Sequence, residues 1–231
     1  MERHFEQQLE KLKTRVIKMC SLVDEQVELS IRAISEPNIE LAQLVIERDK
    51  KVDKYDLKID KICQKLLAIT QPVATDLRLI MSSLLINNNL ERMGDIAVNI
   101  ASQAAYFKEK PEFMSEIKFE EAAKMVINMV RSSIDSFVDK NAVIAKNVLN
   151  MDDQVDHLVS ENCKSLIEIM KRDKSSIDQA IRLYTIMHQL ERLGDHSTNI
   201  AEYVYFIVEA QVIKHRYEEI LWKKEDEDLN D

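Results

Sequence analysis

Apolar residues recur at helical spacing along most of this chain. In the stretch after Pro72 they fall on one broad side of a helix, mostly at intervals of 3, 4 or 7 residues: Leu79, Ile86, Leu90, Met93, Ala97 and Ile100. No stretch keeps the alternation of apolar and polar residues that is typical of a half-buried strand. The pattern therefore predicts an all-α protein, whose helices of roughly 30 residues would be ~45 Å long.

Only short segments interrupt the helical pattern. The breaks lie at residues 35–38, 70–72, 108–112, 140–141 and 173–176, and we expect Pro72 to sit in the first turn of its helix. The chain has 2 Gly and 3 Pro, against roughly 16 and 11 at average usage. Because so few residues favour turns, the breaks predict six long helices that pack as antiparallel neighbours in bundles.

The chain contains an internal repeat. The segment LERMGDIAVNIA at 90–101 recurs as LERLGDHSTNIA at 190–201, with eight of twelve positions identical and both glycines of the protein inside it. A weaker match at an offset of 103 aligns residues 38–53 with residues 141–156. The repeat predicts two tandem, pseudo-twofold-related three-helix bundles. We expect them at residues 1–110 and 111–222, followed by an acidic, disordered tail at 223–231.

Composition narrows the functional classes. The net charge is −9 and no basic stripe is visible, which argues against binding of nucleic acid or of anionic lipid. The N-terminus lacks an apolar signal core, and no run approaches the ~20 apolar residues of a membrane span. The odd number of cysteines (Cys20, Cys63 and Cys163) suits buried thiols in a reducing cytosol. We therefore expect a cytoplasmic protein.

Acidic pairs are the main candidates for chemistry. Glu91 and Asp95 lie one helical turn apart, as do three further pairs: Asp49 and Asp53, Asp152 and Asp156, and Glu191 and Asp195. If the second and third helices of each repeat run antiparallel, the four carboxylates of that repeat face each other, and oxygen-ligated cations would relieve their repulsion. Spacing alone also fits a solvated acidic face. Gly94 and Gly194 indicate close helix packing, room for an ion, or both.

Two further alternatives share this helical fold. A ferritin-like, carboxylate-bridged metal enzyme would use Glu-x-x-His, but no histidine of the chain has a Glu three residues before it. His188 stands three residues before Glu191, in the reverse order, and only in the second repeat. We expect the histidines to be structural or exposed. The glycines lie only inside the repeat, so neither a phosphate loop nor a nucleophile elbow is present. A metal-free helical scaffold remains a further possibility.

The repeated segments resemble the PhoU family of bacterial phosphate-signalling proteins. The resemblance is carried by residues 90–101 and 190–201, by DKKVD at 49–53 and DDQVD at 152–156, and by QPVATDLR at 71–78. It spans nearly the whole chain. Motif order, repeat number and length all agree with that family. In this chain the motifs of the second and fifth helices begin with Asp, where Glu also occurs in the family.

The resemblance implies a function that is not enzymatic. It implies a negative regulator of phosphate uptake and phosphate-starvation signalling, which couples a phosphate ABC transporter's ATPase to a membrane sensor histidine kinase. It also implies a homodimer and multinuclear metal clusters, with iron first and zinc, manganese or magnesium as alternatives. The implied ligands are Asp49, Asp53, Glu91 and Asp95 in the first repeat, and Asp152, Asp156, Glu191 and Asp195 in the second.

Overall fold

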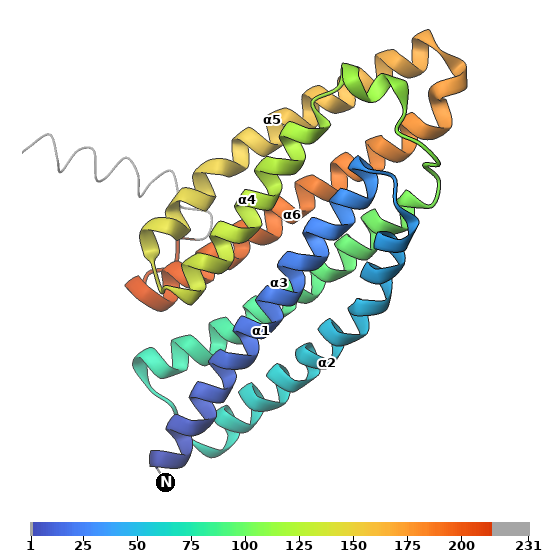
Figure 1. The fold of residues 1–231 in the computed structure, drawn as a ribbon. Coiled ribbons are helices and arrows are strands. Elements are labelled where there is room, and N and C mark those ends of the chain that lie inside the picture. Colours follow the sequence, from blue (N-terminus) through green and yellow to red (C-terminus); the bar gives the residue numbers. More distant parts are fainter. Residues whose placement is uncertain (1, 214–231) are drawn as a thin grey trace, which may run out of the picture.

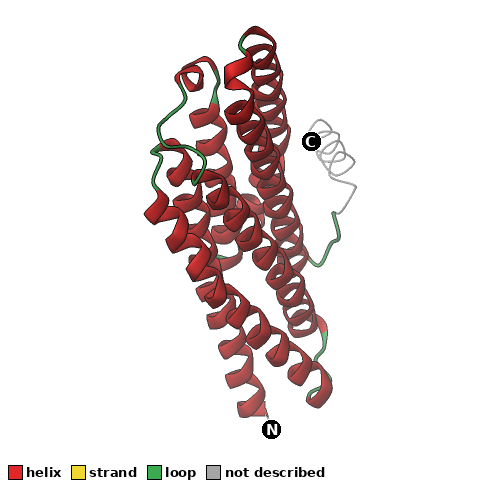
Figure 2. Cartoon of the chain, turned by 90° about the vertical axis from the view of Figure 1, so that its right-hand side faces the viewer, coloured by secondary structure: helices red, strands yellow, loops and turns green. Residues whose placement is uncertain are grey.

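Six long helices make up almost all of the part of the chain that the structure describes. The computed structural model describes residues 2–213, and the tail expected at 223–231 lies outside them. No strand occurs in the described part (Figure 2). The helices are α1 (Glu2–Ser35), α2 (Ile39–Ile69), α3 (Ala74–Ala104), α4 (Phe119–Val138), α5 (Ala142–Arg172) and α6 (Ile177–Glu209), with short 3-10 turns η1 (Glu112–Glu116) and η2 (Lys174–Ser176).

The helices form two three-helix bundles that lie side by side (Figure 1). The first contains α1, α2 and α3, the second contains α4, α5 and α6, and the bundles meet through α3 with α6 and α1 with α4. The six apolar residues that define the stripe along α3 are all buried. The predicted all-α fold of two repeated bundles is therefore confirmed.

Asparagine caps begin the equivalent helices α2 and α5. Asn38 accepts a hydrogen bond from the backbone N–H of Leu41 (3.0 Å), and Asn141 accepts one from Val143 (2.9 Å). Such caps satisfy amide groups that have no partner inside the helix. The residue before the second cap, Lys140, has a φ of 50° and thus makes a left-handed turn without glycine. Both glycines are instead used inside helices.

The start of α3 differs from the prediction. We expected Pro72 in the first helical turn, but α3 begins at Ala74 and its cap is Val73. Ala74, the first residue of the helix, has a φ of 45°, so the chain changes direction where α3 starts. The first helical amides, those of Asp76 and Leu77, therefore donate to the carbonyl of Val73.

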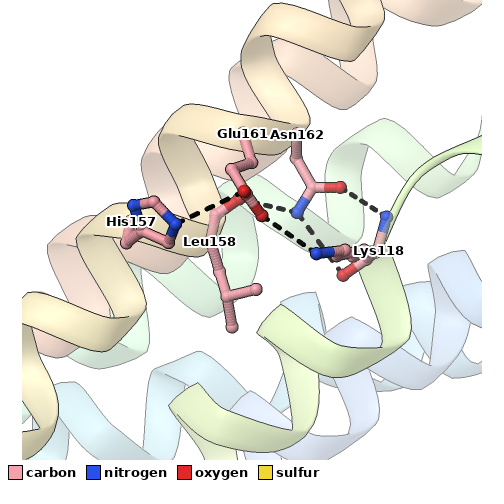
Figure 3. Close-up of polar contacts among 5 residues, drawn as sticks. All are labelled: Lys118, His157, Leu158, Glu161 and Asn162. Carbon is pink, nitrogen blue, oxygen red and sulfur yellow. Dashed lines mark hydrogen bonds and ion pairs between the residues drawn. The ribbon is translucent and has the colours of Figure 1, made fainter.

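A buried asparagine joins α4 to α5 (Figure 3). The Asn162 side chain accepts a hydrogen bond from the backbone N–H of Lys118 (2.6 Å) and donates to the carbonyl of Leu158 (2.8 Å). Outside this contact, Glu161 pairs with the Lys118 ammonium (3.1 Å) and with His157 (3.3 Å). Asn162 thus holds the first turn of α4 in register with α5.

Polar contacts cross the seam between the bundles. Arg131 of α4 donates to Asp24 (3.2 Å) and to Glu28 of α1. The Arg182 guanidinium of α6 lies 3.4 Å from the ring centroid of Tyr106, just beyond α3. Because cations are attracted to aromatic faces, this contact holds the bundles at the end opposite the N-terminus.

The structure also bears on the cysteines and on the apolar character of the helices. All three cysteines are buried and free. Among residues 2–213, no helix combines the length and the apolar character that crossing a bilayer would need.

Candidate metal centre

The glycine of each repeat lies against an aspartate of the neighbouring helix. A Cβ built on Gly94 of α3 would lie 3.3 Å from Asp49 Oδ1 of α2. In the second bundle, a Cβ on Gly194 of α6 would lie 3.5 Å from Asp152 Oδ1 of α5. Each glycine therefore lies where two helices approach closely, and room for an ion beside it stays a prediction.

The facing carboxylates of the second bundle repel each other. Burial, followed by the charges of Asp156 and Asp195, raises the pKa of Asp152 to about 6. Burial and then the charges of Glu191 and Asp195 raise the pKa of Asp156. Asp152 and Asp156 belong to α5, whereas Glu191 and Asp195 belong to α6. The acidic pairs of the two helices therefore face each other across the interface.

The first bundle repeats this electrostatic pattern. Burial raises the pKa of Asp49, with further contributions from Asp53 and Asp95, while a hydrogen bond from Gln26 opposes the shift. Burial and then Asp95 raise the pKa of Glu91, and Arg92 opposes that shift. The four predicted acids of this bundle therefore lie near one another on the α2–α3 face.

Exposure differs among the eight predicted ligands. Three are exposed: Asp53, Asp156 and Asp195. The other five are half-buried: Asp49, Glu91, Asp95, Asp152 and Glu191. Each face thus has a sheltered inner part and an open outer part.

Two carboxylate oxygens are buried without a hydrogen-bond donor. They are Asp152 Oδ1 in the second bundle and Glu91 Oε2 in the first, which has the Arg92 guanidinium 3.5 Å away as an ion-pair partner. A buried charged oxygen is costly unless a hydrogen-bond donor, a water or a cation satisfies it. Each bundle therefore contains one oxygen that a cation would satisfy.

The acids do not form a closed cage. Among the described residues, no three His, Cys, Asp or Glu side chains come close enough together to make a ready-formed metal site. The arrangement is instead two facing acidic pairs in each bundle. A cation here would have to draw the side chains together and keep part of its coordination by water.

The first bundle extends its acidic row by two residues that the ligand set omitted. Buried Asn87 of α3 donates to Asp56 Oδ1 (2.6 Å) and to Asp60 Oδ1 (3.1 Å) of α2. Burial and then Asp60 raise the pKa of Asp56. The sequence could have predicted this extension, because Asp56 and Asp60 lie on the same side of the helix as Asp49 and Asp53. The repeat has Val159, Cys163 and Met187 at the equivalent positions.

Comparison with known proteins identifies this arrangement of repeated helices and acids. The family model described as "PhoU domain" matches residues 16–104 and again residues 119–204. This chain belongs to the PhoU family. The two matches correspond to the two bundles, so this PhoU chain contains two copies of the domain.

Curated relatives and solved structures agree with this family assignment. The "Phosphate-specific transport system accessory protein PhoU homolog" of Aquifex aeolicus is 35% identical, over 91% of this chain and 95% of that protein. The crystal structure of PhoU from Pseudomonas aeruginosa superimposes with a TM-score of 0.85 at 32% identity, over 90% of this chain and 100% of that one. The crystal structure of the phosphate transport system regulatory protein PhoU from Streptococcus pneumoniae superimposes with a TM-score of 0.80 at 26% identity, over 90% of this chain and 98% of that one.

A histidine distinguishes the second PhoU repeat from the first. His188 Nδ1 lies 2.8 Å from Glu191 Oε2, and its Nε2 lies 4.0 Å from Cys163 Sγ. Burial, followed by the charge of Glu191, raises the pKa of Cys163 to about 11, so its thiol stays protonated at neutral pH. His188 is accordingly placed to orient Glu191. His196 instead bonds to Asn89 across the seam between the bundles (2.9 Å).

An arginine partly neutralises the acids of the first PhoU repeat. Arg92 lies 3.5 Å from Glu91 and 3.7 Å from Asp95. Its counterpart Arg192 donates to Gln189 at 3.3 Å. Carboxylate oxygen is the only donor type among the eight predicted ligands. Such a set fits cations that prefer oxygen ligands better than it fits zinc, which favours nitrogen and sulfur.

Proposed function

We propose that this chain is a cytoplasmic, metal-binding adaptor that restrains phosphate uptake and phosphate-starvation signalling. Its relatives bear the name of accessory proteins of phosphate-specific transport. The proposed partners are the ATPase subunit of a phosphate ABC transporter and a membrane sensor histidine kinase. The proposed assembly is a homodimer. In this proposal the protein binds and positions its partners and catalyses no reaction.

The metal part of the proposal rests on one observation. In both bundles an aspartate oxygen lies against a helical glycine, and facing acids surround it. Facing carboxylates repel each other, and this repulsion lowers the stability of both bundles unless a counter-charge is present. The carboxylates that would hold the ions are the eight predicted ligands, four in each bundle.

The residues act by holding neighbouring helices together. A bound cation supplies the positive charge that cancels the carboxylate repulsion. Asp49 and Glu91 then tie α2 to α3, while Asp152 and Glu191 tie α5 to α6. The orientation of two helix pairs, and of the surface they present to the partners, thereby becomes dependent on metal. Iron is the first choice, and manganese or magnesium also fits oxygen ligands.

Metal content tests the ligand assignment. Purified protein is incubated with ferrous iron or with manganese, freed of excess metal by gel filtration, and analysed by mass spectrometry of the elements. The double substitution Glu91→Gln and Asp95→Asn should remove the metal of the first bundle and leave that of the second. A matched control replaces two exposed acids of α2, as Glu40→Gln and Glu47→Gln, and should retain all the metal.

The contrary results are equally specific. Unchanged metal content in the Glu91 and Asp95 variant would show that these residues are not ligands. Absence of metal from the wild type after both incubations would favour a metal-free helical adaptor. The lack of a closed cage among the described acids is the observation that supports this second candidate.

Affinity capture tests the adaptor role separately. Tagged protein is mixed with detergent-solubilised membranes, in the presence of metal and again with chelator. The proposal expects a transporter ATPase or a sensor kinase in the first sample. Recovery of neither, from cells grown with abundant phosphate, contradicts the adaptor role whatever the metal content is.

A further inference from the structure

An apolar groove lies between α3 and α6, away from the acidic faces. Its volume is about 380 Å³, and its floor includes Leu77, Met81 and Leu85 of α3 and Phe206 of α6. The three α3 residues are spaced four apart, so they form a line along one side of the helix. Each is about two-fifths exposed: 39%, 42% and 41%. An exposed apolar line of this kind is typical of a docking surface.

The chain itself leads out of this groove. After α6 ends at Glu209, Ala210 turns the backbone with a φ of 58°, and Val212 and Ile213 then line the groove. Ile213 is only 1% exposed. It is also the last residue that the structure describes. Whatever follows it therefore starts at the groove.

The sequence that follows contains apolar residues at spacings counted from Ile213 that would suit one side of a helix. Tyr217, Ile220 and Leu221 stand four, seven and eight residues beyond it. Positions i, i+4, i+7 and i+8 share one side of a helix. Tyr217 follows Ile213 by four residues, a length of chain that spans at most ~14 Å. The segment is therefore matched to the groove in chemistry and in reach.

The first repeat provides an internal precedent. The segment after α3 does not leave the molecule, because Phe113 and Met114 of η1 are buried. Glu116 then pairs with Arg172 at the end of α5 (2.8 Å). Figure 1 shows this connection lying over the ends of α5 and α6. Under the pseudo-twofold relation, the segment after α6 would meet the corresponding region of α2 and α3.

The charges at the rim agree with this placement. Arg78 lines the groove, and its buried Nε has no hydrogen-bond partner. The segment after Ile213 contains Glu218 and Glu219 between Tyr217 and Ile220. A carboxylate brought to the rim would satisfy the guanidinium through a charge-assisted hydrogen bond.

We propose that residues 214–222 dock in the α3–α6 groove of the same chain, with Tyr217, Ile220 and Leu221 against Met81 and Leu85. The groove is then an intramolecular site that the C-terminal segment covers. A partner or a second copy that needs this surface must first displace the segment. This inference does not depend on metal binding, so either proposal can fail without the other.

A tryptophan reporter tests the docking. Trp222 is the only tryptophan, so the variant Trp222→Phe with Tyr217→Trp places a single indole on the docking face of the full-length chain. In the docked state, its emission shifts to shorter wavelength and iodide quenching decreases. Adding Met81→Glu should reverse both changes. Adding Leu57→Glu, at an exposed apolar residue of α2 that does not line the groove, should reverse neither.

Each other result overturns the proposal. Emission typical of water-exposed indole before any groove substitution means that the segment does not dock. An equal response to Met81→Glu and Leu57→Glu means that it docks elsewhere. A blue shift that disappears on dilution means that the groove accepts the segment of a second copy. Circular dichroism of each variant checks that the helices remain folded.

Discussion

At the scale of single residues, Asp152 is the most informative side chain. It lies against Gly194, its Oδ1 has no donor, and burial raises its pKa to about 6. In water the same carboxyl titrates near ~3.9. Because the folded pKa is the higher one, this carboxyl stabilises the fold while it is protonated. That contribution is lost as pH rises through the folded value.

This shift predicts how pH changes the stability of the metal-free protein. The free energy of unfolding should fall as pH rises from about 4 to above about 6, since Asp152 must lose its proton in a half-buried place beside Asp156 and Asp195. Urea unfolding at a series of pH values, in buffer that contains a metal chelator, measures this dependence of the unfolding free energy on pH. In Asp152→Asn the slope should be shallower. A slope of opposite sign in the wild type would contradict the facing-acid geometry.

The two glycines should respond differently to alanine. A helical Gly→Ala change gains about 0.5–1 kcal/mol when space allows. At Gly194 the new Cβ meets atoms at 3.5–3.6 Å, which is ordinary contact, so Gly194→Ala should stabilise the metal-free protein by about that amount. At Gly94 it meets Asp49 and Val52 at 3.3 Å, so the gain should be smaller or lost. Urea unfolding of both variants without metal measures the difference, and equal gains would be the contrary result.

At the scale of elements, helix starts and turns rely on side chains rather than on glycine. Asn38 and Asn141 cap equivalent helices, whereas Lys140 and Ala210 accept left-handed backbone at two helix ends. The first turn of α4 has no side-chain cap of its own. Asn162 of α5 acts as the cap instead, because its amide oxygen accepts a hydrogen bond from the Lys118 N–H. The start of α4 thus depends on a neighbouring helix.

Removing this contact should destabilise the second bundle. In Asn162→Ala the part-buried N–H of Lys118 loses its acceptor, which costs about 1–3 kcal/mol. The matched control, Glu161→Gln, removes only the exposed ion pairs beside it and should cost less than about 1 kcal/mol. Thermal or urea unfolding of both variants gives the comparison. Equal losses would mean that the buried amide does not fix the start of α4.

At the scale of the whole molecule, the two bundles share a seam but have separate acidic faces. The α2–α3 face belongs to the first bundle and the α5–α6 face to the second, while α3 with α6 and α1 with α4 form the seam. Cations bound at the two faces would therefore stabilise each bundle separately. Through α3 and α6, which contribute to both a face and the seam, they would also affect the packing of one bundle on the other.

Metal should therefore stabilise the protein in two separable portions. A ligand that binds only the folded state adds about 2.7 kcal/mol per independent site at a hundredfold excess over Kd. Unfolding of the wild type should shift with added manganese or ferrous iron and return with chelator. The double variant Glu91→Gln and Asp95→Asn should retain only the share of the second bundle. An undiminished shift in that variant would place the ions elsewhere.

The sequence by itself determined the helices, their number and their repetition. The stripe that includes Leu90 and Met93, the paired Asn residues and the recurrent acids are local patterns, and helix geometry converts such patterns directly into faces. Recognition of the family followed from the same segments. The eight candidate ligands were named for the same reason, since an i,i+4 pair lies on one face wherever the helix packs.

Only the tertiary structure decided which faces meet. The contact of Asp49 with Gly94, the joining of Asp56 and Asp60 by Asn87, the contact of His188 with Cys163 and the hydrogen bond of Asn162 to the Lys118 N–H all link residues of different elements. Their separations along the chain carry no periodic signal. They depend instead on the rotation and register at which close-packed side chains lock two helices together, and this is a property of the assembled bundle.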